Sequence, residues 1–186
     1  MAKLIYSMLA SLDGFVADGS GNLDWAAPDD DVHAFVNDLK RGGGTYLYGR
    51  RLYEVMAYRE TAATEGSAVL ADHARIWQSA GKVVYSRTLE AARSARPRIE
   101  RTFDQDVVRA LKGDATADLS VGGPKLAAAA FAARLVDECH LLLAPVVVGG
   151  GTQALSRGQR LELELLDERR FRGRTVDLHY RSAANG

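Results

Sequence analysis

The chain lacks the features that mark secreted, membrane-spanning or disulfide-bonded proteins. Its 186 residues include a single cysteine, Cys139, which cannot form an internal disulfide and stands in an apolar run typical of a buried side chain. No apolar run reaches the length of about eighteen residues that suggests a membrane span, and the N-terminus becomes polar too early for a signal peptide. We therefore expect one soluble domain over residues 1–186, in the cytoplasm and without a membrane partner.

An excess of one charge and the common catalytic motifs are missing as well. Lys plus Arg number 24 and Asp plus Glu number 24, a balance that argues against a nucleic-acid partner. Neither a P-loop nor the Gly-x-Ser-x-Gly of serine hydrolases occurs. No metal is expected, because the four histidines are scattered without ligand spacing: His33, His73, His140 and His179.

One glycine run imitates a dinucleotide-binding fingerprint. Gly149-Gly150-Gly151-Thr152-Gln153-Ala154 follows an apolar run and matches the spelling G-x-G-x-x-A. The fingerprint needs a helix and a further strand–helix unit after it, and no apolar-periodic helix follows here. We interpret the run as a turn rather than a fingerprint, and a turn that touches a site remains open.

What is present is an alternation of strand and helix patterns. Asp29-Asp30-Asp31 place negative charge where a helix should begin, and glycines at 42–44 should end it. The segment 11–28 reads as a long loop of the kind that often closes over a site. Strands are expected at 4–10, 45–48, 82–85, 99–103, 119–121 and 139–148, helices at 50–56, 67–80, 106–112 and 126–134, and a hairpin of strands at 161–170 and 174–181. This order predicts an α/β fold, with a mixed, mostly parallel sheet covered by helices on both faces and ending in an antiparallel hairpin.

Three strand-to-helix junctions share one chemical character. Gly49-Arg50-Arg51, Ser86-Arg87 and Gly122-Gly123-Pro124-Lys125 each place glycine, hydroxyl or cation just after a strand. Glycine lets backbone N–H groups approach an anion, and a following helix N-terminus favours negative charge. Each junction alone is also an ordinary turn. Their recurrence at the carboxyl ends of strands predicts a cradle for a cofactor with several phosphates.

These segments together resemble the C-terminal reductase domain of the bifunctional riboflavin-biosynthesis protein, and more distantly dihydrofolate reductase. The resemblance runs in order from residue 3 to about residue 155. It rests on Ser11-Leu12-Asp13-Gly14, Gly49-Arg50-Arg51-Leu52-Tyr53, Leu119 to Leu126, Val136-Asp137-Glu138, Leu141 to Pro145 and Gly149-Gly150-Gly151.

The resemblance implies a dihydrofolate-reductase-like, three-layer α-β-α fold, NADPH as hydride donor and a homodimer paired through its sheets. It places Gly49, Arg50, Arg51, Ser86 and Arg87 at the adenosine end, with Arg50, Ser86 and Arg87 on the 2′-phosphate. It places Gly122, Gly123, Pro124, Lys125 and Leu126 on the pyrophosphate, and Leu9, Ala10 and Val16 on the nicotinamide. Leu52 stands where the family has threonine, so one pyrophosphate hydrogen bond is missing.

The substrate side rests on two aspartates. Trp25, Pro28 and Asp30 are similar to the Trp, Pro and acid of dihydrofolate reductase, so Asp30 is a candidate catalytic acid; three consecutive aspartates also make an ordinary helix start. Asp13 is the second candidate, with an Asx-turn at Gly14 as the alternative. The reference reaction is reduction of 5-amino-6-(5-phosphoribosylamino)uracil by NADPH. The alternatives are reduction of dihydrofolate and a nucleotide-binding sensor or assembly domain without turnover.

Overall fold

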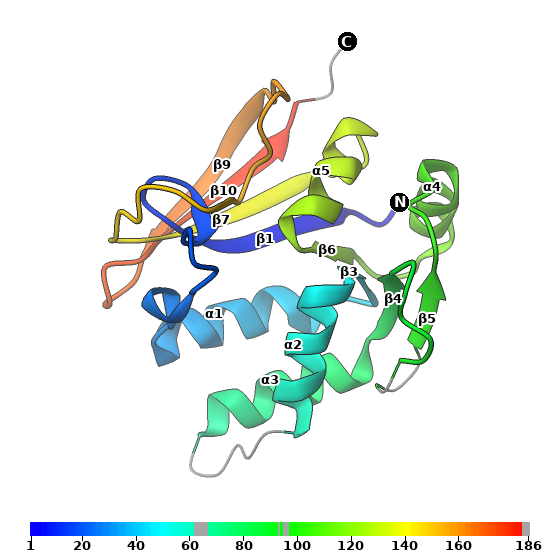
Figure 1. The fold of residues 1–186 in the computed structure, drawn as a ribbon, viewed down its shortest axis with the longest axis horizontal. Coiled ribbons are helices and arrows are strands. Elements are labelled where there is room, and N and C mark those ends of the chain that lie inside the picture. Colours follow the sequence, from blue (N-terminus) through cyan, green and yellow to red (C-terminus); the bar gives the residue numbers. More distant parts are fainter. Residues whose placement is uncertain (62–66, 93, 95–96, 184–186) are drawn as a thin grey trace.

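One eight-stranded sheet runs through the molecule (Figure 1). The computed structural model describes residues 1–61, 67–92, 94 and 97–183. The strand order is β5-β4-β3-β6-β1-β7-β10-β9; neighbours from β5 to β7 are parallel, whereas β10 is antiparallel to β7 and β9. The strands are β1 (Leu4–Ser11), β3 (Thr45–Gly49), β4 (Gly81–Tyr85), β5 (Pro97–Glu100), β6 (Leu119–Gly122), β7 (Glu138–Ala144), β9 (Leu163–Arg170) and β10 (Val176–Ser182). The predicted mostly parallel sheet with a terminal antiparallel hairpin is confirmed.

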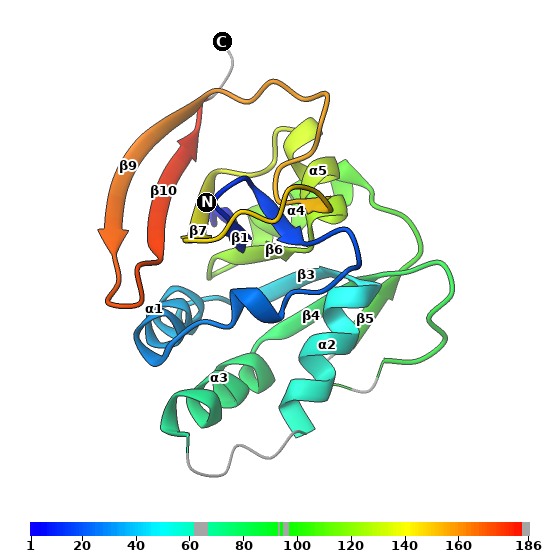
Figure 2. The same ribbon diagram turned by 60° about the vertical axis from the view of Figure 1, so that its left-hand side comes forward.

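Helices cover both faces of this sheet (Figures 1 and 2). Side chains of successive strand residues point to opposite faces, so each strand contributes to two cores. On one face, Tyr6 and Val121 belong to a core that includes Val108 of α4 and Phe131 of α5. The opposite face packs against α1, α2 and α3. The helices are α1 (Asp30–Arg41), α2 (Arg50–Thr61), α3 (Ala68–Ser79), α4 (Gln105–Asp114) and α5 (Pro124–Ala132).

Side-chain caps explain where three helices begin. The Asp29 carboxylate accepts a hydrogen bond from the Val32 N–H at the start of α1. Ser67 and Asp104 play the same part for α3 and α4. Because a capping oxygen satisfies an N–H that has no partner inside the helix, such residues fix the first turn. The acidic start that the sequence predicts for α1 is therefore a cap at Asp29.

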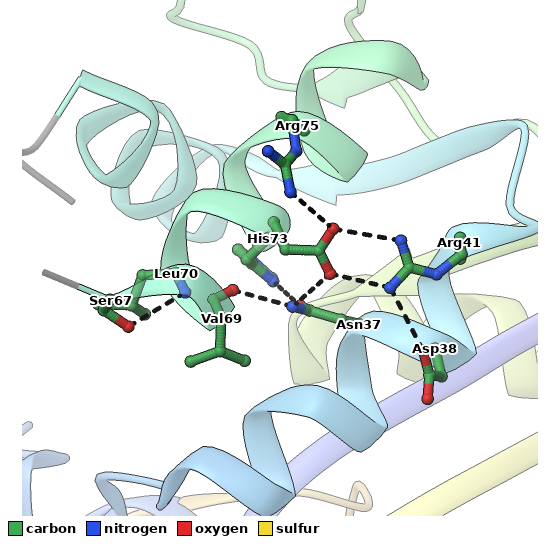
Figure 3. A network of polar contacts seen from close by, with 9 residues as sticks. Asn37, Asp38, Arg41, Ser67, Val69, Leu70, His73 and Arg75 are labelled. Carbon is green, nitrogen blue, oxygen red and sulfur yellow. Dashed lines mark hydrogen bonds and ion pairs between the residues drawn. The ribbon is translucent and has the colours of Figure 1, made fainter. Parts of the chain in front are cut away.

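A polar network, buried at Asn37 and exposed at Arg41, joins α1 to α3 (Figure 3). The Asn37 side chain is completely buried and donates to the Val69 carbonyl at 2.9 Å and to Asp72 at 3.1 Å. Its oxygen lies 2.8 Å from Nδ1 of His73. Arg41 pairs with Asp72 at 2.8 Å, and this bond lowers the pKa of the Asp72 carboxyl to about 2. The network holds α1 at one position over the sheet.

Several element boundaries differ from the sequence prediction. The segment 11–28 contains β2 (Phe15–Ala17) and the short 3-10 helix η1 (Asp24–Ala26), and β2 pairs with β8 (Thr152–Gln153). The edge strand β5 starts at Pro97, earlier than predicted, because it pairs with β4 from Lys82 onward. β7 ends at Ala144 because Pro145 has no N–H for a ladder bond. Among the described residues no helix is long and apolar enough to cross a membrane.

Candidate functional site

The predicted anion-binding junctions meet at one edge of the sheet. Strands β3, β4 and β6 are parallel neighbours, so their carboxyl ends lie on the same edge. The register pairs Tyr48 with Gly122 and Gly49 with Tyr85, which brings Gly122, Gly49 and the following Ser86 side by side. The structure therefore gathers the three junctions as the sequence predicts; their contact with a cofactor remains a prediction.

The central strand β1 extends beyond its neighbour β6 at this edge. Leu4–Tyr6 pair with β6, whereas β7 accompanies β1 from Ile5 to Ser11. Over Ser7–Ser11, β1 therefore has a strand partner on only one side among the described residues. Leu9 is partly exposed there, although β1 lies in the middle of the sheet. Ser7, Met8 and Leu9 are thus partly exposed and adjoin the junction at Gly122, whereas Ala10 and Ser11 are buried.

The three residues predicted to line the nicotinamide do not share one surface. Leu9 packs with the core under α1, while the neighbouring Ala10 points to the opposite face and has no exposed surface. Val16 lies on β2 and is partly exposed. Leu9 and Val16 thus keep side-chain surface for a ligand, and a contact from Ala10 would come from its backbone.

Each glycine of the Gly122-Gly123 turn is required for a different reason. A β-carbon on Gly122 would lie 2.6 Å from side-chain atoms of Leu52 and Tyr48, so Gly122 is a packing requirement. Gly123 has φ +90° and ψ 129°, a conformation that glycine alone adopts readily. It places Pro124 at the start of α5 with no side-chain cap. The N–H groups of the next two residues have no partner inside the helix and are available to an anion.

The residue that departs from the family pattern has a structural role here. Leu52 packs over the Gly122 turn and belongs to the partly buried rim of the core under α2 and α3. Where the family has a threonine hydroxyl, this chain has an apolar contact made by Leu52. The backbone N–H groups at the start of α5 are therefore the donors that remain for a pyrophosphate.

Arginines from three strand ends meet around the segment 86–89. Arg50 donates to Thr88 at 2.7 Å and to Glu54 at 2.7 Å. Arg101 donates to the carbonyls of Ser86 and Leu89 at 3.0 and 2.7 Å. Arg87 lies within the segment, exposed and without a bonded partner among the described residues. Guanidinium groups with unused donors are suited to a phosphate.

Arg101 was not foreseen from the sequence, and the contact of Ser86 with a phosphate stays a prediction. The Ser86 hydroxyl oxygen is buried and accepts from the N–H groups of Thr88 and Leu89, so it shapes the turn that presents Arg87. Arg101 follows β5 directly, as Arg50 follows β3, and Arg87 is the second residue after β4. This shared position was the available signal, and the expected strand at 99–103 concealed it.

Two loops at the carboxyl ends of β1 and β7 are fastened to each other, at the left of Figure 1. The Asp13 carboxylate accepts from Gly149 at 2.8 Å and from Val148 at 3.2 Å, so it ties the loop after β1 to the glycine run after β7. Hydrogen bonds from the Ser11 side chain and these N–H groups lower the pKa of Asp13. Gly14 donates to Ser11 instead of forming an Asx-turn with Asp13. The glycine run is a turn with no helix after it, as predicted.

The three aspartates at the start of α1 make different contacts. Asp29 caps the helix, and a hydrogen bond shared with Asp31 raises the pKa of Asp29 and lowers that of Asp31. Asp31 also accepts from the Arg172 N–H at 3.1 Å, which joins α1 to the β9–β10 turn. Asp30 is exposed and has no bonded partner among the described residues. A structural role at the start of the helix thus accounts for Asp29 and Asp31. It does not account for Asp30.

Comparison with solved structures shows the fold. A putative riboflavin biosynthesis protein from Shewanella sp. PV-4 superposes with a TM-score of 0.77 at 18% identity, over 99% of this chain and all of that one. A pyrimidine reductase-like protein from Corynebacterium diphtheriae gives 0.70 at 12% identity, over 99% and 93% of the chains. A deaminase/5-amino-6-(5-phosphoribosylamino)uracil reductase from Thermotoga maritima gives 0.69 at 14% identity; the match covers 98% of this chain and 57% of that protein.

Sequence comparison agrees with the structural neighbours. The uncharacterized protein YyaP of Bacillus subtilis (strain 168) is 26% identical over 181 residues, covering 96% of this chain and 94% of that protein. The family model for the RibD C-terminal domain matches residues 2–176, nearly the whole chain. The chain belongs to the RibD C-terminal domain family.

Proposed function

We propose that the protein is an NADPH-dependent reductase of the riboflavin-reductase type, which transfers hydride to a ribosylamino or small heterocyclic substrate. The observation that carries the proposal is the carboxyl edge itself. An uncapped helix start behind Gly123, a group of arginines around residues 86–89 and the partly exposed stretch Ser7–Leu9 of β1 lie along one edge of the sheet. Family membership supports a reductase. Two structural neighbours bear the names of a uracil reductase and a pyrimidine reductase-like protein, and a third bears the name of a putative riboflavin biosynthesis protein.

The residues present fit a dinucleotide with a 2′-phosphate. The N–H groups of Lys125 and Leu126 hold the pyrophosphate, because neither has a partner inside α5 and the helix dipole favours negative charge there. Arg50, Arg87 and Arg101 would hold the 2′-phosphate, since Arg50 and Arg101 bind the turn 86–89 and Arg87 is part of that turn. When bound, the cofactor supplies the hydride from its nicotinamide ring.

The substrate end is formed by β1, β2 and the start of α1. Leu9 and Val16 offer apolar surface that orients a planar ring and excludes water. Reduction of an imine carbon adds a hydride to that carbon and a proton to the neighbouring nitrogen. Asp30 is the carboxyl that holds this proton, because it is the one aspartate of its group that the fold does not use. The loop containing Asp13 positions this end and takes no part in the proton transfer.

The same free carboxylate favours a second candidate function, reduction of dihydrofolate. A pteridine also needs a proton at a ring nitrogen, and Asp30 would supply it from the same position. The two candidates share the cofactor end and differ only in the substrate. A nucleotide-binding domain without turnover is the third candidate, of another class.

One experiment separates these candidates. Oxidation of NADPH is followed with 5-amino-6-(5-phosphoribosylamino)uracil, with dihydrofolate and without substrate, and NADPH binding is titrated in parallel. We expect turnover with the ribosylaminouracil. Turnover confined to dihydrofolate selects the second candidate, and tight binding without oxidation in any arm selects the third. A failure to bind NADPH overturns the proposal.

A further inference from the structure

A cavity lies at the edge of the sheet opposite to the candidate cofactor site. Its volume is about 520 Å³, within the usual range for small-molecule sites. It is formed by the end of α5, the starts of β1 and β7, the loop before β9 and the end of β10. Eight-residue β1 separates the two edges by roughly 23 Å, at about 3.3 Å per residue. The cavity is therefore a separate place on the protein.

Charged residues rim the cavity, and apolar residues form part of its wall. Its apolar lining includes Phe131, Val136 and Leu161. Four cations face three carboxylates: Lys3, Arg134, Arg160 and Arg181 against Asp137, Glu138 and Glu162. The formal charge of the lining is therefore four minus three, or +1. Such a lining fits one negative charge on a partly apolar molecule.

All of these charges except one are already paired. Lys3 binds Glu138 at 2.7 Å, and Glu138 also lies 3.1 Å from Nε2 of His179. The Asp137 carboxylate accepts from the Leu4 N–H and from Lys112, each at 2.6 Å. Arg160 pairs with Glu162 at 2.7 Å, and Arg181 pairs with Glu164 at 3.1 Å.

Arg134 is the exception. Its guanidinium has no hydrogen-bond or ion-pair partner among the residues that the structure describes, and its side chain is exposed to solvent. Because the carboxylates around it already have cationic partners, none of them neutralises Arg134. The unpaired charge of the cavity is thus localised on one side chain.

The backbone of Arg134 also adopts a conformation that suits another residue. Arg134 has φ +54° and stands just after α5, where its N–H donates to Phe131 and the next N–H, of Leu135, donates to Ala130. This pair of bonds is the Schellman ending of a helix, in which glycine is the usual residue at the left-handed position. An arginine there strains the backbone, and strained residues of this kind gather at functional sites. A cation at a helix C-terminus also suits the helix dipole, so the test must separate the two roles.

We propose that the cavity is a second ligand site, which binds a small monoanion with an apolar body, such as an aromatic or aliphatic carboxylate, through a bidentate contact with Arg134. The single unpaired charge selects a monoanion over a phosphate dianion, because the surrounding carboxylates repel additional negative charge. Glu138, which is buried, holds Lys3 at the rim, and the apolar wall takes the body of the ligand. The site is independent of the proposed reductase activity.

Benzoate, its neutral analogue benzamide and the dianion phenyl phosphate serve as probes. Each is titrated into the full chain without a nucleotide, and ¹H–¹⁵N amide spectra report where it binds. We expect saturable benzoate shifts at the cavity residues 131–138 and 159–162, and weaker binding of both benzamide and phenyl phosphate. Absence of saturable shifts there, or equal binding of benzoate and benzamide, overturns the proposal. Tighter binding of phenyl phosphate overturns the assignment to monoanions.

The variant that tests Arg134 does not threaten the fold. Arg134→Gly removes the guanidinium and at the same time places the preferred residue at the left-handed position, so the protein should fold with little change in melting temperature. The matched control is Arg174→Gly, because Arg174 is also a left-handed arginine (φ +69°) but lies in the β9–β10 turn, outside the cavity.

The two variants should differ in benzoate affinity if Arg134 binds the ligand. We expect Arg134→Gly to weaken benzoate binding about tenfold or more, as loss of a charge-assisted bond does. Arg174→Gly should bind benzoate like the parent. If Arg134→Gly lowers the melting temperature and leaves the benzoate dissociation constant unchanged, Arg134 serves only the helix end and the ligand site is refuted.

Discussion

The two edges of the same sheet hold their charges in opposite ways. At the amino edge, Lys3, Glu138 and His179 form one chain of contacts, and Lys112 pairs with Asp137. At the carboxyl edge, Arg87 has no partner among the described residues, and the start of α5 has no side-chain cap. Paired charges cancel each other's fields and hold strands together, whereas unpaired donors at a strand end leave a positive potential. The carboxyl edge therefore offers more unpaired donors to an anion than the amino edge, where Arg134 alone among the charged residues that line the cavity has no partner in the described part of the chain.

A substitution in the Gly122-Gly123 turn should have the largest effect on cofactor binding. In Gly123→Val a β-branched side chain meets φ +90° and would block the approach of a pyrophosphate, so we expect NADPH binding to be lost. Strain should cost about 1–3 kcal/mol of stability. Melting temperature and NADPH dissociation constant are measured on the same protein.

A second glycine provides the control for Gly123. Gly158 has φ +79° and open space around it, and it lies in the loop before β9, away from the carboxyl edge. Gly158→Val should lose stability to a similar degree and bind NADPH like the parent. If Gly123→Val melts early and still binds NADPH normally, the turn is only structural and the contrast between the edges fails.

The next effect concerns Asp30. We expect Asp30→Asn to lower kcat about a hundredfold, the usual contribution of a general acid, and to leave the NADPH dissociation constant unchanged. Asp38→Asn is the control, since Asp38 lies on the same helix, is exposed and pairs with Arg41 at 3.3 Å. Equal kcat values for parent and Asp30→Asn would show that the proton comes from elsewhere.

Cofactor preference should follow from the arginines at 50, 87 and 101. NADPH should bind about tenfold to a hundredfold more tightly than NADH, the effect of a charge-assisted bond of about 1.5–3 kcal/mol. Arg87→Ala should remove much of this preference by weakening NADPH alone, and Arg109→Ala, an exposed α4 arginine paired with Asp106, should not. Titration of both cofactors decides; equal dissociation constants in the parent contradict the assignment.

A homodimer that pairs through one face of the sheet would leave both edges of the sheet free. β7 and β10 are interior strands, yet Leu143, Val176 and Leu178 stay partly exposed on one face, and Leu165 of β9 is half exposed. We propose a homodimer through this face, with a mass in light scattering of twice the monomer. Leu178→Lys should shift the mass to one copy, and Val107→Lys on α4 should not. A single-copy mass for the parent at micromolar concentration refutes the dimer.

The smallest effect tests a paired charge away from both sites. The pKa of Asp72 is lowered to about 2 from 3.8 by its bonds to Arg41, so its contribution to stability is present above pH 3.8 and is lost as the pH falls toward 2. Asp72→Asn should flatten the decline of melting temperature in that window and leave cofactor affinity at neutral pH unchanged. An identical decline in both proteins would show that the ion pair adds nothing, as for many exposed pairs.

The sequence predicts features that arise from local chemistry. The strand at Leu119–Gly122 alternates apolar Leu119 and Val121 with small residues, and the turn after it needs glycine for its own dihedral angles, so both could be foreseen. The chain could not show that Asp13 binds Gly149, 136 residues away. The pairing of β2 with β8 could not be predicted either. Strands of three and two residues are too short to show a hydrophobic pattern.

At the candidate site, too, features set by local sequence could be predicted and contacts between distant residues could not. The gathering of the junctions at 49–51, 86–87 and 122–125 on one edge could be inferred because parallel strands place their carboxyl ends together. Arg101 and the separate duties of three adjacent aspartates could not, since they depend on which distant backbone groups lie within reach. Asp29, Asp30 and Asp31 have identical side chains, yet each has a different environment in the folded protein.

The fastening of the loop after β1 to the loop after β7 has a consequence for how the site opens. Leu12 donates to Val146, Ala154 donates to Gly14, and Asp13 accepts from two further amides. Neither loop can swing away while these bonds hold, so the two loops form one cooperative unit. Their amide hydrogens should therefore exchange with solvent at a common rate, set by a single event that opens both loops together.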